Sequence, residues 1–498
     1  YCKGEFSNGA KHNLQSSYIH LPTLRFQLGT GQVEGSLELS DFTNPHINLA
    51  LKGNSSLSDL IGFTQSNWIE EADGTIQFDI AVNGNLNNLK SKQGFLDTET
   101  KGHISLDATD IVFKKGNKSI ERIQTDFSLE GKDLTINQFK ASIDKSDIVI
   151  SGTLKNIVPY LLSEKQPLVA DISYKSDYMN LEHVILPIPA APNTNSTFAL
   201  PENISVNAQV TIAELVFHEF QASRINGSIH WKGKTIETPG IQAETMKGKM
   251  VLRGTISNTA NGNFLIASSI ECKQTDMFEL FHQCNNLGQT AITDKHIRGV
   301  LNATIDMAGE WDSKMVCNLD KLKASGVIHI TNGQLINYEP LEALSKYVNV
   351  EDLRNLRFAD LKNNIEISNR TIRIPSMDVM NNALNLNIAG VHTFDNVMDY
   401  HLRIKLSELL AKKRKAKTNE FNEEETADGI FLYLSMKGPA DNLKFSYDKK
   451  GAREQLKENL KKESEAAKNI WKKELGLDTD ETIKEKKTDT DELEFEQE

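Results

Sequence analysis

The chain has few cysteines, prolines and glycines for its 498 residues. Four cysteines cannot supply a disulfide framework, and 12 prolines with 30 glycines are too few for a collagenous or proline-rich linker protein. Lys and Arg number 56 against 68 Asp and Glu, and the resulting net charge of -12 argues against a nucleic-acid-binding protein. The content of 39% hydrophobic and 25% charged residues is typical of folded proteins, and the length corresponds to about three domains.

Long hydrophobic runs are also missing. The longest, at 184–192 and 429–436, fall far short of the roughly 18 residues that a membrane-spanning helix needs. The sequence opens on Tyr1 rather than Met and shows no signal peptide. We therefore expect any targeting or anchoring segment to lie upstream of this sequence.

Motifs of enzyme chemistry are not found. The sequence has no P-loop, dinucleotide-binding glycine fingerprint, GxSxG elbow or HExxH helix. Cys272, His282 and Cys284 form the one cluster of metal-ligand types, and it is either part of a metal site or a buried cysteine beside an exposed histidine. We favour the second interpretation, because no CxxC pair is present and His296 is not at ligand spacing. We expect no catalytic residue, cofactor or metal; the spacing does not decide whether Cys272 pairs with Cys284, although we expect free thiols.

Alternation of apolar and polar residues dominates the sequence. In 104–108, 204–212, 301–307 and 384–388 every second residue is apolar and the residues between are mostly polar. Such segments have one apolar and one solvated face, which is typical of antiparallel strands covered on one side only. The predicted lining of an apolar groove consists of Ile104, Leu106, Val206, Ala208, Val210, Leu301, Ile305, Leu384, Leu386 and Ile388.

Glycines punctuate the alternating segments at irregular spacing. Segments end in sequences such as SGTLKN (151–156) and RGTISN (253–258), in which an Asn follows four residues after the Gly. Gly adopts unusual backbone angles and Asn forms side-chain turns, so the pattern indicates a recurring turn at strand ends. We predict a mainly β protein, a long curved antiparallel sheet that forms an open apolar groove with a few short helices. Stacked β-sandwiches remain the alternative.

The chain divides by composition into several parts. Helices are expected after Thr275 or Asp276, after Pro340 and over about 450–475. The loop at 411–427 carries a basic and then an acidic run. The predicted parts are N-terminal β repeats of a truncated groove (1–100), groove repeats with a Pro-rich linker near 186–202 (101–270), a helical insertion (271–299), a C-terminal β region (300–448), an amphipathic helix (449–476) and an acidic disordered tail (477–498).

From about residue 100 onward the sequence resembles the C-terminal region of AsmA-like proteins, in the form seen in Bacteroidota. The resemblance rests on long blocks in order: CNNLGQTAITDKHIRG (284–299), LINYEPLEALSKYVNVEDLRNLRFADLKNNIEISNRTIRIPSMDV (335–379), LNLNIAGVHTFDNVMDYHLRIKLSELLAKK (384–413) and LYLSMKGPADNLKFSYDKKG (432–451). This family is related to bridge-like lipid-transfer proteins, in which a β groove carries phospholipid acyl chains between membranes.

The resemblance implies a non-enzymatic periplasmic protein of the Gram-negative cell envelope. An N-terminal segment missing from this chain would anchor it to the inner membrane. The β groove would carry or hold phospholipid between the inner and outer membranes and support outer-membrane biogenesis, with phospholipid acyl chains, both membranes and envelope proteins as partners and no nucleic acid. The alternative is a structural envelope scaffold that assists outer-membrane protein assembly without lipid transport. An enzyme such as a β-helix polysaccharide lyase is a distant third.

Overall fold

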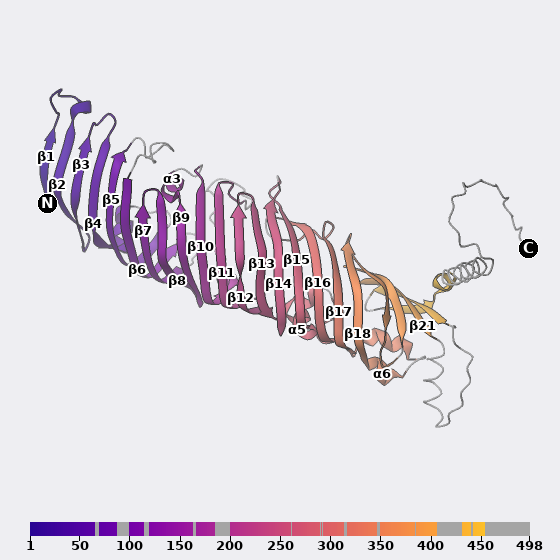
Figure 1. Cartoon of the computed structure of the whole chain (residues 1–498). Helices are drawn as coiled ribbons and strands as arrows, with labels where there is room; N and C mark the ends of the chain where they lie inside the picture. The colour runs from indigo at the N-terminus through magenta and orange to yellow at the C-terminus, as the bar shows by residue number, and fades with distance from the viewer. Residues whose placement is uncertain are drawn as a thin grey trace, which may run out of the picture.

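A computed structural model describes residues 1–64, 69–86, 99–113, 119–162, 166–184, 200–259, 261–288, 290, 292–312, 316–345, 349–383, 385–405, 431–439 and 442–453. Within these residues the chain forms one open 23-stranded sheet that runs the length of the molecule (Figure 1). At a spacing of about 4.8 Å between strands, the sheet extends roughly 105 Å across its strands. The prediction of a mainly β protein is confirmed.

Each strand pairs with the next strand along the chain. The first ten are β1 (Cys2–Ser7), β2 (Tyr18–Leu28), β3 (Gly31–Ser40), β4 (His46–Ser56), β5 (Ile69–Asn85), β6 (Glu99–Phe113), β7 (Ser119–Glu130), β8 (Asp133–Ile143), β9 (Ser146–Lys155) and β10 (Leu168–Asn180). The next seven are β11 (Ile204–Phe217), β12 (Phe220–Lys232), β13 (Thr235–Thr245), β14 (Gly248–Asn258), β15 (Phe264–Asp276), β16 (Ile297–Trp311) and β17 (Lys323–Ile336). The last six are β18 (Asn355–Ser368), β19 (Thr371–Val379), β20 (Leu386–Thr393), β21 (Val397–Lys405), β22 (Phe431–Pro439) and β23 (Lys444–Tyr447).

The expectation of an antiparallel sheet is wrong at one place. Strands β10 and β11 are parallel, with Leu168 opposite Ile204 and Asn180 opposite Val216. Parallel neighbours cannot be joined by a tight turn, because the chain must return to the end of the sheet where the first strand began. The predicted Pro-rich linker near 186–202 falls in this connection, and residues 186–199 of the linker lie outside the described residues. The sheet is therefore mixed.

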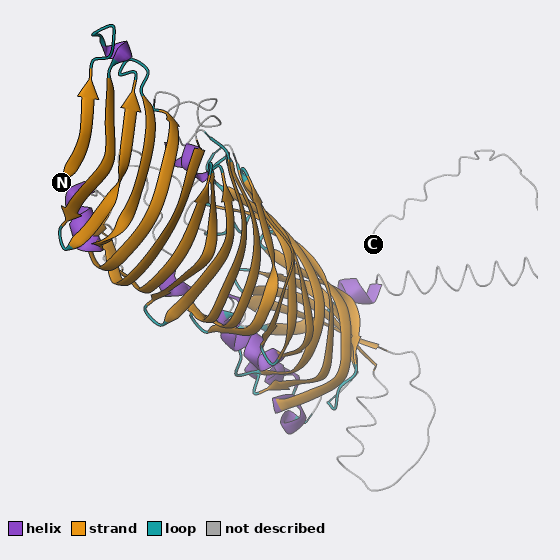
Figure 2. Cartoon of the chain, turned by 60° about the vertical axis from the view of Figure 1, so that its left-hand side comes forward, coloured by secondary structure: helices purple, strands orange, loops and turns teal. Residues whose placement is uncertain are grey.

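Short helices gather along one long margin of the sheet, called here the helical margin. Helices α1 (Leu57–Thr64), α4 (Leu181–Val184) and α5 (Met277–Gln283) follow β4, β10 and β15, and η4 (Glu339–Leu344) with α6 (Val350–Arg354) connects β17 to β18. The register places all these connections at the same end of the strands, and Figure 1 shows α5 and α6 there. Helix α3 (Ile157–Leu162) lies at the other margin, as do the turn η1 (Leu14–Ser16) and the β1 end next to it. Figure 2 shows the bowed strands, with helices at both ends of the strands and more of them along one margin.

Helix α5 forms as its sequence predicts. The side chain of Asp276 caps the helix by accepting a hydrogen bond from the Glu279 N–H at 3.0 Å. Its apolar face buries Met277 and Phe281 against the sheet. The helix expected after Pro340 is the 3₁₀ turn η4, and η3 (Asn285–Gly288) follows α5. The predicted loop at 411–427, most of the helix at 450–475 and the tail at 477–498 lie outside the described residues.

The buried core is divided into clusters along the helical margin. Leu57 of α1 belongs to a cluster with Ala72 and Ala108. Leu181 of α4 packs on Met179 and Ile212, and Phe281 of α5 packs with Leu301. Each cluster buries the ends of several strands under one helix, and burying one large apolar side chain contributes about 1.5–3 kcal/mol. The helices therefore cover one edge of the apolar face rather than the whole of it.

All the strands in the described ranges belong to one sheet. Among the described residues each strand has its extensive contacts with its ladder neighbours and with the helices at the margins. A sandwich would bring non-neighbouring strands face to face at about 10 Å. The described strands thus form one continuous sheet, which differs from the separate stacked sheets of the β-sandwich alternative.

Candidate apolar binding face

An unbroken row of apolar side chains and glycines runs across the N-terminal half of the sheet. Residues directly opposite in a ladder share one face, so the register can be followed from strand to strand. From β3 to β11 the row is Val33, Gly53, Phe78, Ile104, Phe127, Ile136, Gly152, Ile172 and Ala208. Seven of these nine are apolar side chains and the other two are glycines, so no polar side chain interrupts the row.

A second row continues on the same face toward the C-terminus. Two residues beyond Ala208 on β11, Val210 begins a row that reaches β18. Its members are Val210, Gly227, Ile241, Leu252, Ile270, Ile305, Gly326 and Ile365. We call the two rows together the apolar stripe.

The apolar side chains of the stripe are mostly half-buried. Phe78, Ile104, Phe127, Ile172 and Ala208 are intermediate in exposure, whereas the residues beside them in sequence are mostly more exposed. Their partial exposure follows from the single-layer fold, because neighbouring strands cover their flanks and nothing in the described chain covers their tips. An extended half-exposed apolar surface of this kind marks an interaction or ligand site more often than a solvated surface.

Gly152 shows why glycine stands in the stripe. Its φ of +143° is a backbone conformation that L side chains rarely adopt. A Cβ built at this position would come within 2.1 Å of the Asp171 carbonyl oxygen on β10. The glycine thus permits close approach of β9 and β10 in a sheet that bends, a common use of glycine inside strands.

The described residues of the predicted lining lie on this one face of the sheet. Ile104, Ala208, Val210 and Ile305 belong to the stripe, and Leu106 and Val206 lie one step away along their strands. Leu301 is buried in the cluster under α5 with an exposure of 6%. Leu386 and Ile388 pack against a C-terminal cluster, and Leu384 lies outside the described residues.

Sequence reasoning missed most of the stripe, since it singled out four of the 13 apolar side chains. The other nine alternate with polar residues in the same way: Val33, Phe78, Phe127, Ile136, Ile172, Ile241, Leu252, Ile270 and Ile365. Alternation assigns each residue to a face of its own strand, but only the register shows which residues of different strands lie side by side.

Tyr174 carries the one phenol beside the stripe on β10, opposite Val210. Burial, together with the negative charge of nearby Asp147, raises its pKa to about 12. The phenol is therefore neutral at physiological pH. The apolar face thus gains no charge at this point.

The opposite face of the same strands is charged. Arg25, Glu34, Lys52 and Asp79 lie opposite one another on β2 to β5, with Arg25 Nε 3.8 Å from Glu34 Oε2 and Lys52 Nζ 3.7 Å from Asp79 Oδ2. A shallow cavity of about 1080 Å³ opens over these side chains. These exposed ion pairs stabilise little, about 0–1 kcal/mol each, and their face is the solvated one.

The C-terminal end of the apolar face is closed by a compact core. Ile404 of β21 is 0% exposed and Leu434 of β22 is 3% exposed. Leu344 of η4 and Leu353 of α6 pack on them from the helical margin. The apolar face is therefore half-open over β4 to β18 and sealed over β20 to β22.

The ladder opens between β18 and β19, just before the sealed part. The two strands pair only at Glu366–Arg373, Ile367–Ile372 and Ser368–Thr371. Pro375 follows, with a register irregularity between Ile374 and Met377, and proline has no N–H to donate to a ladder. In the opening the Asn363 side chain donates to the Pro375 carbonyl oxygen at 3.1 Å.

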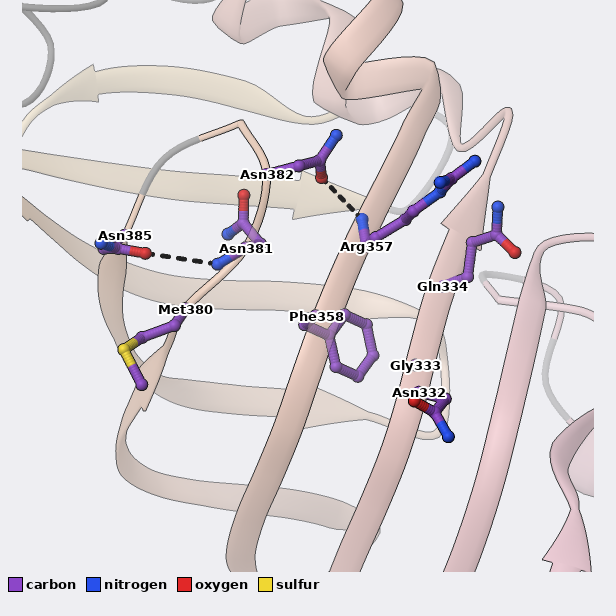
Figure 3. A pocket seen from close by; sticks show the side chains of 9 residues that line it. All are labelled: Asn332, Gly333, Gln334, Arg357, Phe358, Met380, Asn381, Asn382 and Asn385. Carbon is purple, nitrogen blue, oxygen red and sulfur yellow. Dashed lines mark hydrogen bonds between the residues drawn. The ribbon is translucent and has the colours of Figure 1, made fainter.

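A cavity of about 540 Å³ lies at the helical end of this opening (Figure 3). Gln334 and Arg357 extend from neighbouring strands on one wall, and Phe358 lies on β18 beside Gly333. Met380 and three asparagines come from the connection between β19 and β20. The cavity therefore joins an aromatic ring to a group of amides and a guanidinium.

The cysteines are free thiols. Cys272 is buried in the cluster under α5, and burial raises the pKa of Cys272 and Cys284 alike. His282 Nδ1 lies 3.0 Å from Asp294 Oδ2. In the described part of the chain no three His, Cys, Asp or Glu side chains gather as a metal-binding group.

Comparison with known proteins gives no relative: no family model matches, and no significant match occurs among curated proteins or solved structures. None of the helices in the described ranges has both the length and the apolar character that crossing a membrane requires.

Proposed function

We propose that the apolar stripe forms an open groove that carries or holds phospholipid acyl chains, and that the protein moves phospholipid between the inner and outer membranes of a Gram-negative envelope. In this proposal the sheet lies in the periplasm and an N-terminal segment upstream of this chain anchors it to the inner membrane. The protein supports outer-membrane biogenesis without catalysing a reaction.

The observation that carries the proposal is the unbroken, one-sided apolar face of a single-layer sheet. A binding protein for one small ligand needs an enclosed pocket, whereas the stripe continues across strand after strand from Val33 to Ile365. A continuous face of this kind allows a bound ligand to move along the sheet from strand to strand. The resemblance to AsmA-like proteins gives the same expectation from independent sequence blocks.

The energetics favour such a surface. Moving an acyl chain of about 16 carbons from a membrane into water costs on the order of 10 kcal/mol, at about 0.8 kcal/mol per CH₂. Side chains such as Phe78, Ile104 and Phe127 can shield one side of the chain while the headgroup stays in water. Because adjacent strands offer similar surfaces at a spacing of about 4.8 Å, each step along the stripe exchanges one apolar contact for another.

Site-specific photocrosslinking tests this proposal. A photoreactive residue at Ile104 is expected to crosslink phospholipid in the full-length anchored protein. The same residue at Ser105, the next position on β6, faces the opposite side of the sheet and is the matched control. A further variant, Ile104→Asp, places a charge in the stripe and is expected to block lipid passage while the sheet stays folded.

Absence of lipid crosslinks at Ile104, or equal crosslinking at Ile104 and Ser105, contradicts lipid carriage along the stripe. A folded protein that still supports outer-membrane assembly under those conditions would act as the structural scaffold instead.

A further inference from the structure

We propose that the cavity between β18 and β19 binds the phosphate group of an amphiphilic ligand, with Arg357 on the phosphate and Phe358 leading to the apolar stripe. The assignment deepens the proposed function and rests on it for the apolar half of the ligand. The phosphate half rests on the cavity alone.

Arg357 is held in place but not neutralised. Its Nε donates to Asn355 Oδ1 at 3.3 Å, and Gln334 Nε2 donates to the same oxygen. Among the described residues no carboxylate lies within ion-pair distance of the guanidinium. Its two terminal nitrogens therefore remain available on the cavity wall, and a guanidinium fork matches the oxygens of a phosphate.

The backbone around Arg357 is fixed across the opening of the sheet. Asn382 Oδ1 accepts from the Arg357 N–H at 2.7 Å, and Asn382 Nδ2 donates to the Asn355 carbonyl oxygen at 3.1 Å. The Asn382 N–H donates to the Arg357 carbonyl oxygen at 3.1 Å. This asparagine replaces the missing ladder partner, so the cavity keeps its shape where the two strands separate.

Phe358 connects the cavity to the apolar face. Its ring lies over Gly333, where a Cβ would come within 1.9 Å of the ring. The same ring packs on the cluster that contains Cys272 and Phe281, and Leu361 beside it does so too. Four residues on from Leu361, Ile365 is the last member of the stripe. An acyl chain leaving the stripe thus meets Phe358 on the apolar side of β18. Arg357, the next residue, points to the other side of the strand, and both residues line the cavity at the opening of the sheet.

The cavity lies where the accessible part of the apolar face ends. Beyond β19 the face is sealed by the C-terminal core, whose members include Ile404 at 0% exposure. A lipid that slides along the stripe therefore stops at the opening. The charge of the site, one cation that has no ion pair within the described ranges, favours an anionic headgroup over a neutral one.

Calorimetric titration of the full chain with dihexanoylphosphatidylglycerol below its micelle concentration tests the assignment. Arg357→Gln is expected to raise the Kd on the order of tenfold or more, because a charge-assisted hydrogen bond to phosphate is lost. Arg373→Gln is the matched control, since Arg373 is also exposed and has no ion pair among the described residues. Arg373→Gln is expected to change the Kd by no more than about twofold, because removing an exposed charge outside the site has a small effect.

Two further measurements distinguish binding of the lipid from binding of soluble phosphates. Glycerol 3-phosphate and inorganic phosphate are expected to bind more weakly than the lipid, and Phe358→Ala is expected to weaken the lipid alone. Equal binding of lipid and soluble phosphates, unaffected by Phe358→Ala, overturns the amphiphilic ligand. Equal losses in Arg357→Gln and Arg373→Gln overturn the phosphate site itself.

The photocrosslinking of Ile104 distinguishes failure of this inference from failure of the proposed function. Lipid crosslinks at Ile104 that persist in Arg357→Gln, with unchanged lipid affinity, reject only the phosphate site. Tight phosphate binding without crosslinks at Ile104 rejects lipid carriage along the stripe.

Discussion

His401 Nδ1 lies 2.6 Å from Oδ2 of Asp448, a carboxylate whose side chain is only 8% exposed. His401 is on β21, and Asp448 directly follows β23 at the edge strand. The other oxygen of Asp448 accepts from the Gly451 N–H at 3.0 Å, as an N-cap residue does for the helical turn that begins at 449. One side chain thus ties the edge strand, the next helical turn and β21 together.

Asp448→Asn is expected to destabilise this edge by about 1–2 kcal/mol, because it weakens the cap and the bond to His401. Burial works to raise the pKa of Asp448, but the hydrogen bonds from Gly451 and His401 outweigh it and hold the pKa below its usual range. The stabilisation is therefore present above pH 4 and is lost as the pH falls through the lowered pKa. Hydrogen exchange of 444–453 measures the effect. Asp399→Asn, which removes the more distant carboxylate 3.6 Å from the same histidine, is the control and is expected to change this exchange little.

Tyr400 is expected to make the protein sensitive to alkali. Burial raises its pKa to about 12, with Tyr338 as a second cause. An unfolded tyrosine titrates near pH 10, so the folded state binds more protons and loses stability between about pH 10 and 12. The loss from this residue amounts to roughly 2–3 kcal/mol, since one pH unit corresponds to about 1.4 kcal/mol. Tyr400→Phe removes the titration, and denaturant unfolding at pH 8, 10 and 11.5 is expected to show a flatter profile for the variant. Parallel profiles for both proteins would reject this assignment.

Leu386 and Ile104 alternate with polar residues in the same way, yet the fold places them in different surroundings. Leu386 lies between Val379 and Ile404 and is partly buried against the C-terminal core, whereas Ile104 belongs to the half-exposed stripe. Leu386→Asp is therefore expected to destabilise the protein by about 1–3 kcal/mol, because it places a charge against that core. Ile104→Asp is expected to cost much less. Thermal unfolding of both variants checks the difference.

Asn387→Asp is the control for Leu386→Asp on the opposite face. Asn387 accepts from the Ser376 hydroxyl and donates to Asp378 Oδ1, each at 2.9 Å. The substitution places two carboxylates side by side and is expected to cost about 1 kcal/mol. A larger loss for Asn387→Asp than for Leu386→Asp would contradict the sealed core.

Local sequence was sufficient for the faces of the strands and for helix α5. Apolar residues at every second position assign Ile104, Val206 and Leu301 to one face, and Asp276 before Met277 marks the helix start. Both features depend on neighbours in sequence. They could therefore be predicted without knowing the fold.

Other features depend on residues that are distant in sequence. The parallel pairing of β10 and β11 depends on where the connection at 185–203 returns, which alternation does not record. The opening at β18 depends on Pro375 in the next strand, which the sequence of β18 does not contain. Whether Leu386 is covered depends on Leu344 and Leu353, which come from η4 and α6. Strand register and the burial of a face depend on contacts between distant segments, so they cannot be read from the sequence of one segment.

Substitution of Phe281 in α5 tests whether the helices of the helical margin stabilise the sheet. Its side chain is 7% exposed and packs with Leu301, Ile330 and the thiol of Cys272. Phe281→Ala is expected to destabilise the protein by about 3–5 kcal/mol, since it removes a large buried ring and leaves a cavity. It is also expected to expose Cys272, because the helix covers that thiol.

Phe278→Ala on the same helix is the matched control for Phe281→Ala. Phe278 stacks on His282 with ring centroids 5.6 Å apart and lies under the Arg298 guanidinium, away from the core cluster. Alkylation of the native protein, mapped by mass spectrometry, is expected to label Cys272 rapidly in Phe281→Ala and slowly in Phe278→Ala and the parent. Exposed Cys2 serves as the internal standard for labelling. Slow labelling of Cys272 in both variants, with equal stability, would show that Phe281 of α5 does not cover this edge of the apolar face.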